Sequence, residues 1–322
     1  MDKVALGVDI GGTEVKIGLI TSSGKILEKQ KFQHRVPSEP DKIINQLYKE
    51  IKQMKFWNNK KIVNLLTGIG IGSAGDINQT EGIIRFSTNF GWKNVYIKKL
   101  LQNKFNIPII VDNDANAACW GSFCLEFKNK INNLVCFTLG TGVGGGIVIN
   151  NKLYRGTTGS AGELGHVTLY PDGRKCSCGN YGCLERYIGA YDLINDVKNK
   201  IISGEKTVIT KLIKNNLNLL SPELVYKAAC INDKFARQVW TDFGKQLGIV
   251  VASIVNILNP ELIVLTGGVA DAYKFFIDIV RDTVKKRAFK TPSENLKIVV
   301  SKLGKNLGII GAACLVLFPS YD

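Results

Sequence analysis

One pattern occurs twice in this sequence: an apolar strand-like segment, a glycine-rich turn and a second strand-like segment. The first copy covers residues 4–32 and reads VALGVDI, GGT, EVKIGLI, TSSGK and ILEKQKF; the second covers residues 134–154 and reads LVCFTL, GTGVGG, GIVIN, NK and LYRG. Alternation and turn residues predict antiparallel strands in both copies. An internal repeat of this kind predicts two related lobes that face each other across a cleft.

The rest of the chain alternates between strand and helix patterns, which predicts an α/β protein. We expect helices near 40–54, 95–104, from Ala115 and across 233–258, strands near 65–72, 107–112, 261–268 and 295–302, and a closing helix. At 322 residues the chain is long enough for two domains. We therefore expect an N-terminal lobe over residues 1–118 and a C-terminal lobe over residues 119–304, with the closing helix, 305–322, packing back on the first lobe.

Composition and charge indicate a soluble protein. Hydrophobic residues make up 45% and charged residues 21% of the chain, and we find no apolar run near the roughly 18 residues that cross a membrane. The start, MDKVALGVDIGGT, lacks the basic and apolar regions of a signal peptide. We expect a cytoplasmic protein without a membrane partner.

The net charge of +15, from 42 Lys and Arg against 27 Asp and Glu, raises the question of nucleic-acid binding. The lysines are dispersed over many segments, without a basic block interleaved with aromatic residues and without a helix-turn-helix pattern ahead of the first strand. We therefore expect no nucleic-acid partner.

Three of the eight cysteines are closely spaced and follow a histidine. His166, Cys176, Cys178 and Cys183 could bring three thiolates and an imidazole to the corners of a tetrahedron. A zinc ion with four protein ligands has no open position for a reacting water, so this pattern predicts a structural zinc site. The alternative is three unrelated thiols in one loop. The remaining cysteines are expected to be reduced core residues: Cys119, Cys124, Cys136, Cys230 and Cys314.

Two glutamates bracket the predicted zinc loop. Glu163 precedes His166 by three residues, and Glu185 follows Cys183. If one ring nitrogen of His166 binds zinc, ligation fixes the role of the other nitrogen. The two carboxylates could then accept hydrogen bonds from the hydroxyl groups of a polyol; the alternative is that both are ordinary surface glutamates.

Three glycine turns could hold phosphate groups, because glycine lets backbone N–H groups approach an anion closely. They are Asp9 to Thr13, Gly140 to Gly146, and Thr266 to Gly268. Asp9 also offers a carboxylate that could hold Mg²⁺ through water. The second turn matches G-x-G-x-x-G, but a strand follows where a dinucleotide fold needs a helix. Each turn alone could be a simple hairpin turn.

Taken together, the motifs VDIGGTEVKIGLI, VDNDANAA, TLGTGVGGG, GELGH, CSCGNYGCLE and LTGGV resemble the ROK family of sugar kinases and sugar-responsive repressors. The resemblance spans nearly the whole chain. It implies two ribonuclease H-like (actin-like ATPase) lobes around a central cleft, which close over ATP and a hexose, with a zinc-binding loop.

The resemblance also implies roles for individual residues. The catalytic aspartate falls on Asp114, and Asp112 is its nearby competitor. The sugar-binding positions are Asn89, Asn113, Glu163, His166 and Glu185, and His166 is also a zinc ligand. The adenine and phosphate side would use Gly11, Gly12, Thr13, Thr141, Gly142, Gly267 and Gly268. At Gly72 to Gly75 this chain lacks a proline that many relatives have before the last glycine.

The function implied is transfer of a phosphoryl group from ATP, with Mg²⁺, to the 6-hydroxyl of a hexose, with glucose as the leading acceptor. N-acetylmannosamine and N-acetylglucosamine are alternative acceptors. The alternative from another class is a regulator that binds a sugar without phosphorylating it; the start at the first phosphate hairpin and the intact phosphate turns favour the enzyme. We expect a homodimer or homotetramer.

Overall fold

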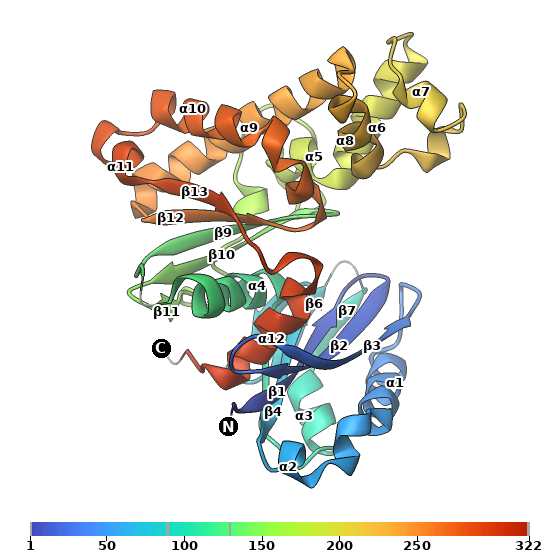
Figure 1. The fold of residues 1–322 in the computed structure, drawn as a ribbon, viewed down its shortest axis with the longest axis vertical. Coiled ribbons are helices and arrows are strands. Elements are labelled where there is room, and N and C mark those ends of the chain that lie inside the picture. Colours follow the sequence, from blue (N-terminus) through green and yellow to red (C-terminus); the bar gives the residue numbers. More distant parts are fainter. Residues whose placement is uncertain (1, 88–89, 129, 321–322) are drawn as a thin grey trace. The chain divides into compact units, whose positions relative to one another are not determined.

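The computed structural model describes residues 2–87, 90–128 and 130–320 and consists of two compact units (Figure 1). Unit 1 comprises Met1–Cys136, Gly146–Gly162 and Lys302–Asp322, and unit 2 comprises Phe137–Gly145 and Glu163–Ser301. The chain thus returns to unit 1 twice after it first leaves. The division of the chain into domains after residue 118 stays a prediction.

The main sheet of unit 1 has the strand order β3-β2-β1-β4-β8. Its strands are β1 (Val4–Ile10), β2 (Glu14–Thr21), β3 (Ile26–Gln33), β4 (Leu66–Ser73) and β8 (Ile109–Asn113). β1, β2 and β3 pair antiparallel, whereas β1, β4 and β8 run parallel. Ile10 pairs with Ser73, and Ser73 pairs with Asn113. The carboxyl ends of the three parallel strands therefore meet at one edge, which is where α/β sheets usually bind ligands.

A second five-stranded sheet has the order β11-β10-β9-β12-β13. Its strands are β9 (Leu134–Leu139), β10 (Val143–Ile149), β11 (Lys152–Leu153), β12 (Leu262–Thr266) and β13 (Lys297–Val300). β10 and β11 pair antiparallel and β12 and β13 parallel. In both sheets the order is third, second, first, fourth and fifth strand, so the repeat in the sequence is a repeat in topology.

The helices of unit 1 are α1 (Pro40–Gln53), α2 (Lys60–Val63), α3 (Ile97–Gln102), α4 (Asp114–Ser122) and α12 (Leu307–Leu317), with short helical turns η1 (Lys55–Asn58), η2 (Phe123–Phe127) and η6 (Gly304–Asn306). α12, red in Figure 1, packs against β1 and β4. It comes close because Gly7 and Gly70 have no side chain: a Cβ at either would overlap the carbonyl oxygen of Ile309 or Ala312.

Unit 1 also contains a small antiparallel sheet that the sequence patterns did not predict. It has the order β5-β6-β7, formed by β5 (Asp76–Asn78), β6 (Ile83–Ser87) and β7 (Trp92–Val95). The guanidinium group of Arg85 on β6 contacts Asp76 on β5 through two hydrogen bonds of 2.8 and 2.6 Å. The same group donates to the carbonyl of Thr158, which ties the segment before Gly162 to this sheet.

Unit 2 is mostly helical. Its helices are α5 (Glu185–Ile188), α6 (Ala190–Ile202), α7 (Ile209–Leu212), α8 (Pro222–Cys230), α9 (Lys234–Leu258), α10 (Ile277–Arg287) and α11 (Lys290–Asn295), with helical turns η3 (Leu164–His166), η4 (Leu217–Leu219) and η5 (Gly268–Phe275). Asp233 caps the start of α9 by accepting the N–H of Ala236. The helix ends at Leu258. Asn259, its C-cap, has a left-handed backbone conformation and precedes Pro260.

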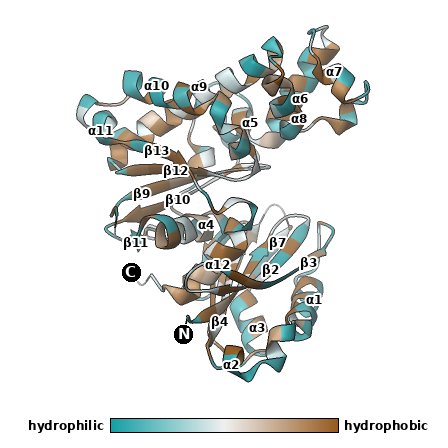
Figure 2. Cartoon of the chain, in the orientation of Figure 1, coloured by the Kyte–Doolittle hydropathy of each residue, from teal (hydrophilic) through white to brown (hydrophobic). Residues whose placement is uncertain are grey.

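α9 is long and apolar enough, by length and composition alone, to cross a membrane. A buried core helix meets the same test, and the uncharged part of α9 begins only after Lys245. Half of its most apolar window is nevertheless buried inside the protein. Trp240 and Phe243 pack there against Phe276, with ring centroids 6.0 and 4.7 Å away, and polar residues cover the outer turns of α9 and α10 (Figure 2). The packing is that of a core helix.

Four of the five cysteines predicted to be core residues are buried: Cys119, Cys124, Cys136 and Cys314. Burial raises the pKa of the Cys124 thiol to about 12, which keeps it protonated and unreactive at neutral pH. The prediction was wrong for Cys230, which is exposed. Cys230 is the last residue of α8, and the apolar neighbours in its sequence, Ala228 and Ala229, are the residues that face the core.

Candidate functional site

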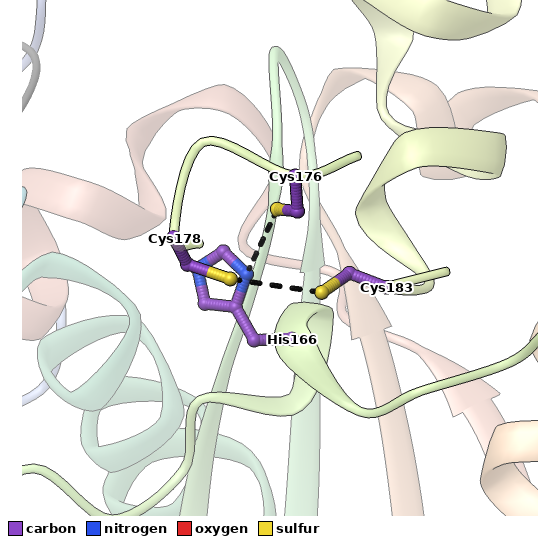
Figure 3. Close-up of side chains that lie close together, drawn as sticks. All are labelled: His166, Cys176, Cys178 and Cys183. Carbon is purple, nitrogen blue, oxygen red and sulfur yellow. Dashed lines mark hydrogen bonds between the residues drawn. The ribbon is translucent and has the colours of Figure 1, made fainter. Parts of the chain in front are cut away.

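Four side chains from one short region of unit 2 converge on a common point (Figure 3). They are the predicted zinc ligands His166, Cys176, Cys178 and Cys183, and their ligand atoms all lie within 4.8 Å of one another. Two short backbone pairings hold the loop closed, one between Thr168 and Cys183 and one between Lys175 and Tyr181. The prediction that one loop gathers these residues is confirmed.

The distances in this cluster fit a zinc ion. The Sγ atoms of Cys178 and Cys183 are 3.7 Å apart, and Nδ1 of His166 is 3.6 Å from Sγ of Cys176. A tetrahedral ion with bonds of about 2.3 Å to sulfur and about 2.0 Å to nitrogen requires nearly these separations, about 3.8 and 3.6 Å. The four residues can therefore hold a zinc ion with no open coordination position.

The two ring nitrogens of His166 face different groups. Nδ1 faces Cys176, whereas Nε2 lies 3.9 Å from a carboxylate oxygen of Glu163. A ring that binds metal through Nδ1 carries its proton on Nε2. His166 is thus oriented to present an N–H group on the side of Glu163, away from the cluster.

Glu185, the first residue of α5, lies against the second glycine turn. One carboxylate oxygen accepts the N–H of Val143 at 2.9 Å, and a Cβ on Gly142 would overlap the same carboxylate. A Cβ on Gly165 would overlap the carbonyl oxygen of Val143. The turn from Thr141 to Val143 therefore contacts both the Glu163–His166 turn and Glu185, so residues predicted for phosphate and for sugar lie together in unit 2.

In unit 1, Asp114 is the first residue of α4 and follows directly on the carboxyl end of β8. The side chain of Asn113 caps the helix by accepting the N–H groups of Ala115 and Asn116, at 2.8 and 3.2 Å. Its amide nitrogen donates to the carbonyl of Gly75 at 3.1 Å. We call residues Asn113 to Asn116 the catalytic turn, after the catalytic role predicted for Asp114; it holds Asp114, half-buried, at the edge where the parallel strands end.

Asp112, the competitor of Asp114, is not available for proton transfer. Its side chain is only 2% exposed and forms an ion pair with Arg155 at 2.9 Å. Its other oxygen accepts the N–H of Asn113 and the side-chain amide of Asn116. A buried carboxylate with this pairing serves structure, whereas Asp114 at the same edge is half-buried.

The first glycine turn lies between β1 and β2. A Cβ on Gly11 would lie 3.1 Å from the carbonyl oxygen of Glu14, whereas a Cβ on Gly12 would meet open space. The carboxylate of Asp9 contacts Gly308 at the start of α12, and a Cβ on Gly308 would overlap this carboxylate. Burial raises the pKa of Asp9. His34, whose role the sequence did not suggest, closes the turn: its Nε2 donates to the carbonyl of Gly11 at 2.7 Å, and its backbone N–H donates to Thr13.

The third turn follows β12. Gly267 has a positive φ of 93° and lies against the carbonyl of Leu139, where no other residue would fit, and Gly268 has open space around it. Of the predicted sugar-binding residues, Asn113 lies in unit 1, and Glu163, His166 and Glu185 lie in unit 2. Asn89 lies outside the described residues.

Three buried polar atoms near the catalytic turn have no hydrogen-bond partner among the described residues: Oγ of Ser73, Oγ of Ser87 and Oδ1 of Asn116. Ser73 pairs with Asn113 across the sheet, and Ser87 contacts Gly75, which accepts from Asn113. Buried polar atoms are nearly always bonded, so such a group marks a place for water or ligand. Ser73 lies in the unusual Gly72 to Gly75 loop, whereas no sequence pattern pointed to Ser87.

A family model described as the ROK family matches residues 5–318. The chain belongs to the ROK family. This ROK protein is 32% identical over 316 residues to a glucokinase of Halalkalibacterium halodurans, covering 98% of this chain and 95% of the relative. It is 31% identical to a xylose repressor of Caldicellulosiruptor bescii, covering 98% of this chain and 80% of the repressor.

Its structure is similar to that of a ROK family glucokinase from Streptomyces griseus in complex with glucose and AMPPNP. The TM-score is 0.85 at 28% sequence identity, covering 97% of this chain and 99% of the other. The mixed α/β fold expected from the family motifs is therefore confirmed.

Proposed function

We propose that this ROK protein is an ATP-dependent sugar kinase that phosphorylates the 6-hydroxyl of a hexose, with glucose as the leading acceptor. The observation that carries the proposal is the catalytic turn: of the two adjacent acids, Asp112 is buried in an ion pair and Asp114 is held at the carboxyl edge of the sheet. The similarity to glucokinases supports it.

In the proposed reaction Asp114 accepts the proton of the sugar hydroxyl as the phosphoryl group is transferred. Phosphoryl transfer needs positioning and charge stabilisation more than covalent chemistry. The residues that would hold the ring hydroxyls are Asn89, Asn113, Glu163, His166 and Glu185. Backbone N–H groups at Gly11, Gly12, Thr13, Thr141, Gly142, Gly267 and Gly268 would hold the nucleotide.

Two metals belong to the proposal. Mg²⁺ would accompany ATP and neutralise phosphate charge, and Asp9 would hold it through water. One structural zinc per chain would be held by His166, Cys176, Cys178 and Cys183, whose separations fit a tetrahedral ion. The closed zinc site would keep Glu163, His166 and Glu185 in place and take no part in the chemistry.

The acceptor is the least determined part of the proposal, because the hydroxyl groups that these residues would hold are common to several sugars. N-acetylmannosamine and N-acetylglucosamine are the alternatives, and they differ from glucose at C2. We further propose that the protein works in the cytoplasm as a homodimer or homotetramer.

A second candidate function is a sugar-responsive regulator that binds a sugar without phosphorylating it. The 31% identity to a xylose repressor over 98% of this chain favours this alternative. The two functions share a sugar site and differ in phosphoryl transfer, so one assay separates them.

That assay measures ADP release with ATP and Mg²⁺ across a panel that includes glucose, mannose, N-acetylmannosamine, N-acetylglucosamine and xylose, beside calorimetric binding of each sugar. A kinase releases ADP with at least one hexose, and Asp114→Asn abolishes the release while sugar binding persists. Binding without any ADP release would instead establish the regulator. Phosphate at a position other than the 6-hydroxyl, seen by NMR of the product, would correct the regiochemistry.

A further inference from the structure

Arg155 lies just after β11, in the segment of unit 1 that leads to Gly162. Its side chain is 5% exposed, and its Nε donates to Oδ2 of Asp112 at 2.9 Å. Its Nη1 lies 3.3 Å from the carbonyl oxygen of Ser320 and 3.5 Å from that of Leu153. Arg155 is thus the cationic partner of the carboxylate that precedes the catalytic turn.

Asp112 links Arg155 to the catalytic turn through hydrogen bonds. Its Oδ1 accepts the backbone N–H of Asn113 at 2.8 Å and the side-chain amide of Asn116 at 3.1 Å. Asn113 in turn caps α4 through Ala115 and Asn116. A continuous chain of hydrogen bonds therefore runs from the guanidinium group to the backbone on both sides of Asp114.

We propose that Arg155 is a positioning residue for Asp114, acting through Asp112. The inference rests on the proposed kinase function. Without Arg155 the buried carboxylate of Asp112 would lack its charge partner, and it would recover solvation by turning away from Asn113 and Asn116. The catalytic turn would then lose the contacts that fix Asp114. A displacement of about 1 Å at a reacting group can lower the rate about 100-fold.

The competing explanation is that Arg155 only stabilises the fold, because it also binds the C-terminal segment at Ser320. Trp120 offers a matched control, since its indole N–H donates to the carbonyl of Phe318 at 2.8 Å without contacting Asp112. Leu47, fully buried in the core on α1, offers a second control that lowers stability away from the turn.

The test compares Arg155→Gln, Arg155→Lys and the pair Asp112→Asn with Arg155→Gln against Trp120→Phe and Leu47→Ala. All are assayed well below their Tm values. We expect Arg155→Gln to lower kcat roughly 100-fold with KM for ATP within about threefold of wild type, and the paired variant to recover at least part of that loss, because it removes both buried charges. The controls keep kcat within about threefold.

Amide hydrogen exchange gives a readout that needs no activity. Faster exchange at Asn113, Ala115 and Asn116 is expected in Arg155→Gln, and unchanged exchange there in both controls. Should Arg155→Gln fail to fold, kcat and hydrogen exchange of Arg155→Lys test the proposal instead. Lysine keeps the charge but cannot reproduce the three contacts of the guanidinium group.

Unchanged kcat and unchanged exchange at the turn would overturn the inference, and so would a paired variant whose kcat is no higher than that of Arg155→Gln. A wild-type protein that phosphorylates no sugar would refute the kinase proposal instead. The exchange result would still decide whether Arg155 holds the catalytic turn.

Discussion

The catalytic turn of unit 1 and the zinc loop of unit 2 fix polar side chains in different ways. The catalytic turn is held by a buried ion pair and by four hydrogen bonds that the side chains of Asp112 and Asn113 accept. The zinc loop contains the four predicted ligands, whose ligand atoms lie within 4.8 Å of one another. Short polar segments have little core to order them; here protein partners order the segment in unit 1, and the proposed zinc would order the loop in unit 2.

The difference has a consequence for how each region fails. A hydrogen-bonded turn loses one contact at a time, whereas a loop ordered by a metal loses its shape when the metal leaves. The largest effect should nevertheless come from the catalytic turn, because it carries Asp114, the group proposed to accept the proton.

Asp114→Asn should lower kcat by roughly 10²–10⁴-fold, because the amide cannot accept the proton of the sugar hydroxyl. The side chain keeps its size, so Tm and sugar binding should stay near wild type. Steady-state kinetics and calorimetry check this. Near-normal turnover would assign the base to another residue.

Cys178→Ser tests the other region. Metal analysis should find about one zinc per wild-type chain. The variant should lose this zinc, and its Tm should fall by roughly 5–10 °C. Cys230→Ser is the matched control, since Cys230 is also exposed but far from the cluster in sequence. This control should change neither the zinc content nor the Tm. A wild-type protein without metal and with full activity would refute the zinc site.

His166→Cys separates metal binding from sugar binding within the zinc loop. A fourth thiolate can replace the imidazole, so zinc and fold should remain. The N–H group that faces Glu163 is lost, and KM for the sugar should rise about 5- to 150-fold, which corresponds to roughly 1–3 kcal/mol, while KM for ATP changes little. An unchanged sugar KM with zinc retained would make His166 a metal ligand only.

The smallest effect is expected for Asn180→Ala, which removes the hydrogen bond of 3.0 Å to Thr168 across the zinc loop. With zinc bound, Tm should fall by no more than about 2 °C, because one exposed hydrogen bond contributes about 1 kcal/mol or less. In metal-free protein the same change should matter more. Equal effects with and without zinc would show that the metal does not order this loop.

Much of the fold follows from local patterns. Helices predicted at 40–54 and 233–258 are α1 and α9. The two predicted glycine hairpins are β1-β2 and β9-β10, and the structure shows that their sheets share one strand order. The zinc ligands are equally visible, because 18 residues contain all four and a short loop can only fold back on itself. The small sheet β5-β6-β7 was missed, because its strands are short and only partly alternating.

The sequence by itself determined which residue types occur together: glycines in hairpin turns, a histidine and three cysteines in one loop, and two acids on either side of Asn113. These signals depend on spacing along the chain. Only the tertiary structure shows that Asp112 is buried and paired, because its partner, Arg155, is 43 residues away in the chain. It likewise placed Glu185 on the N–H of Val143 and Cys230 at the surface. Burial and charge pairing arise from distant segments that meet only on folding, so no local pattern contains them.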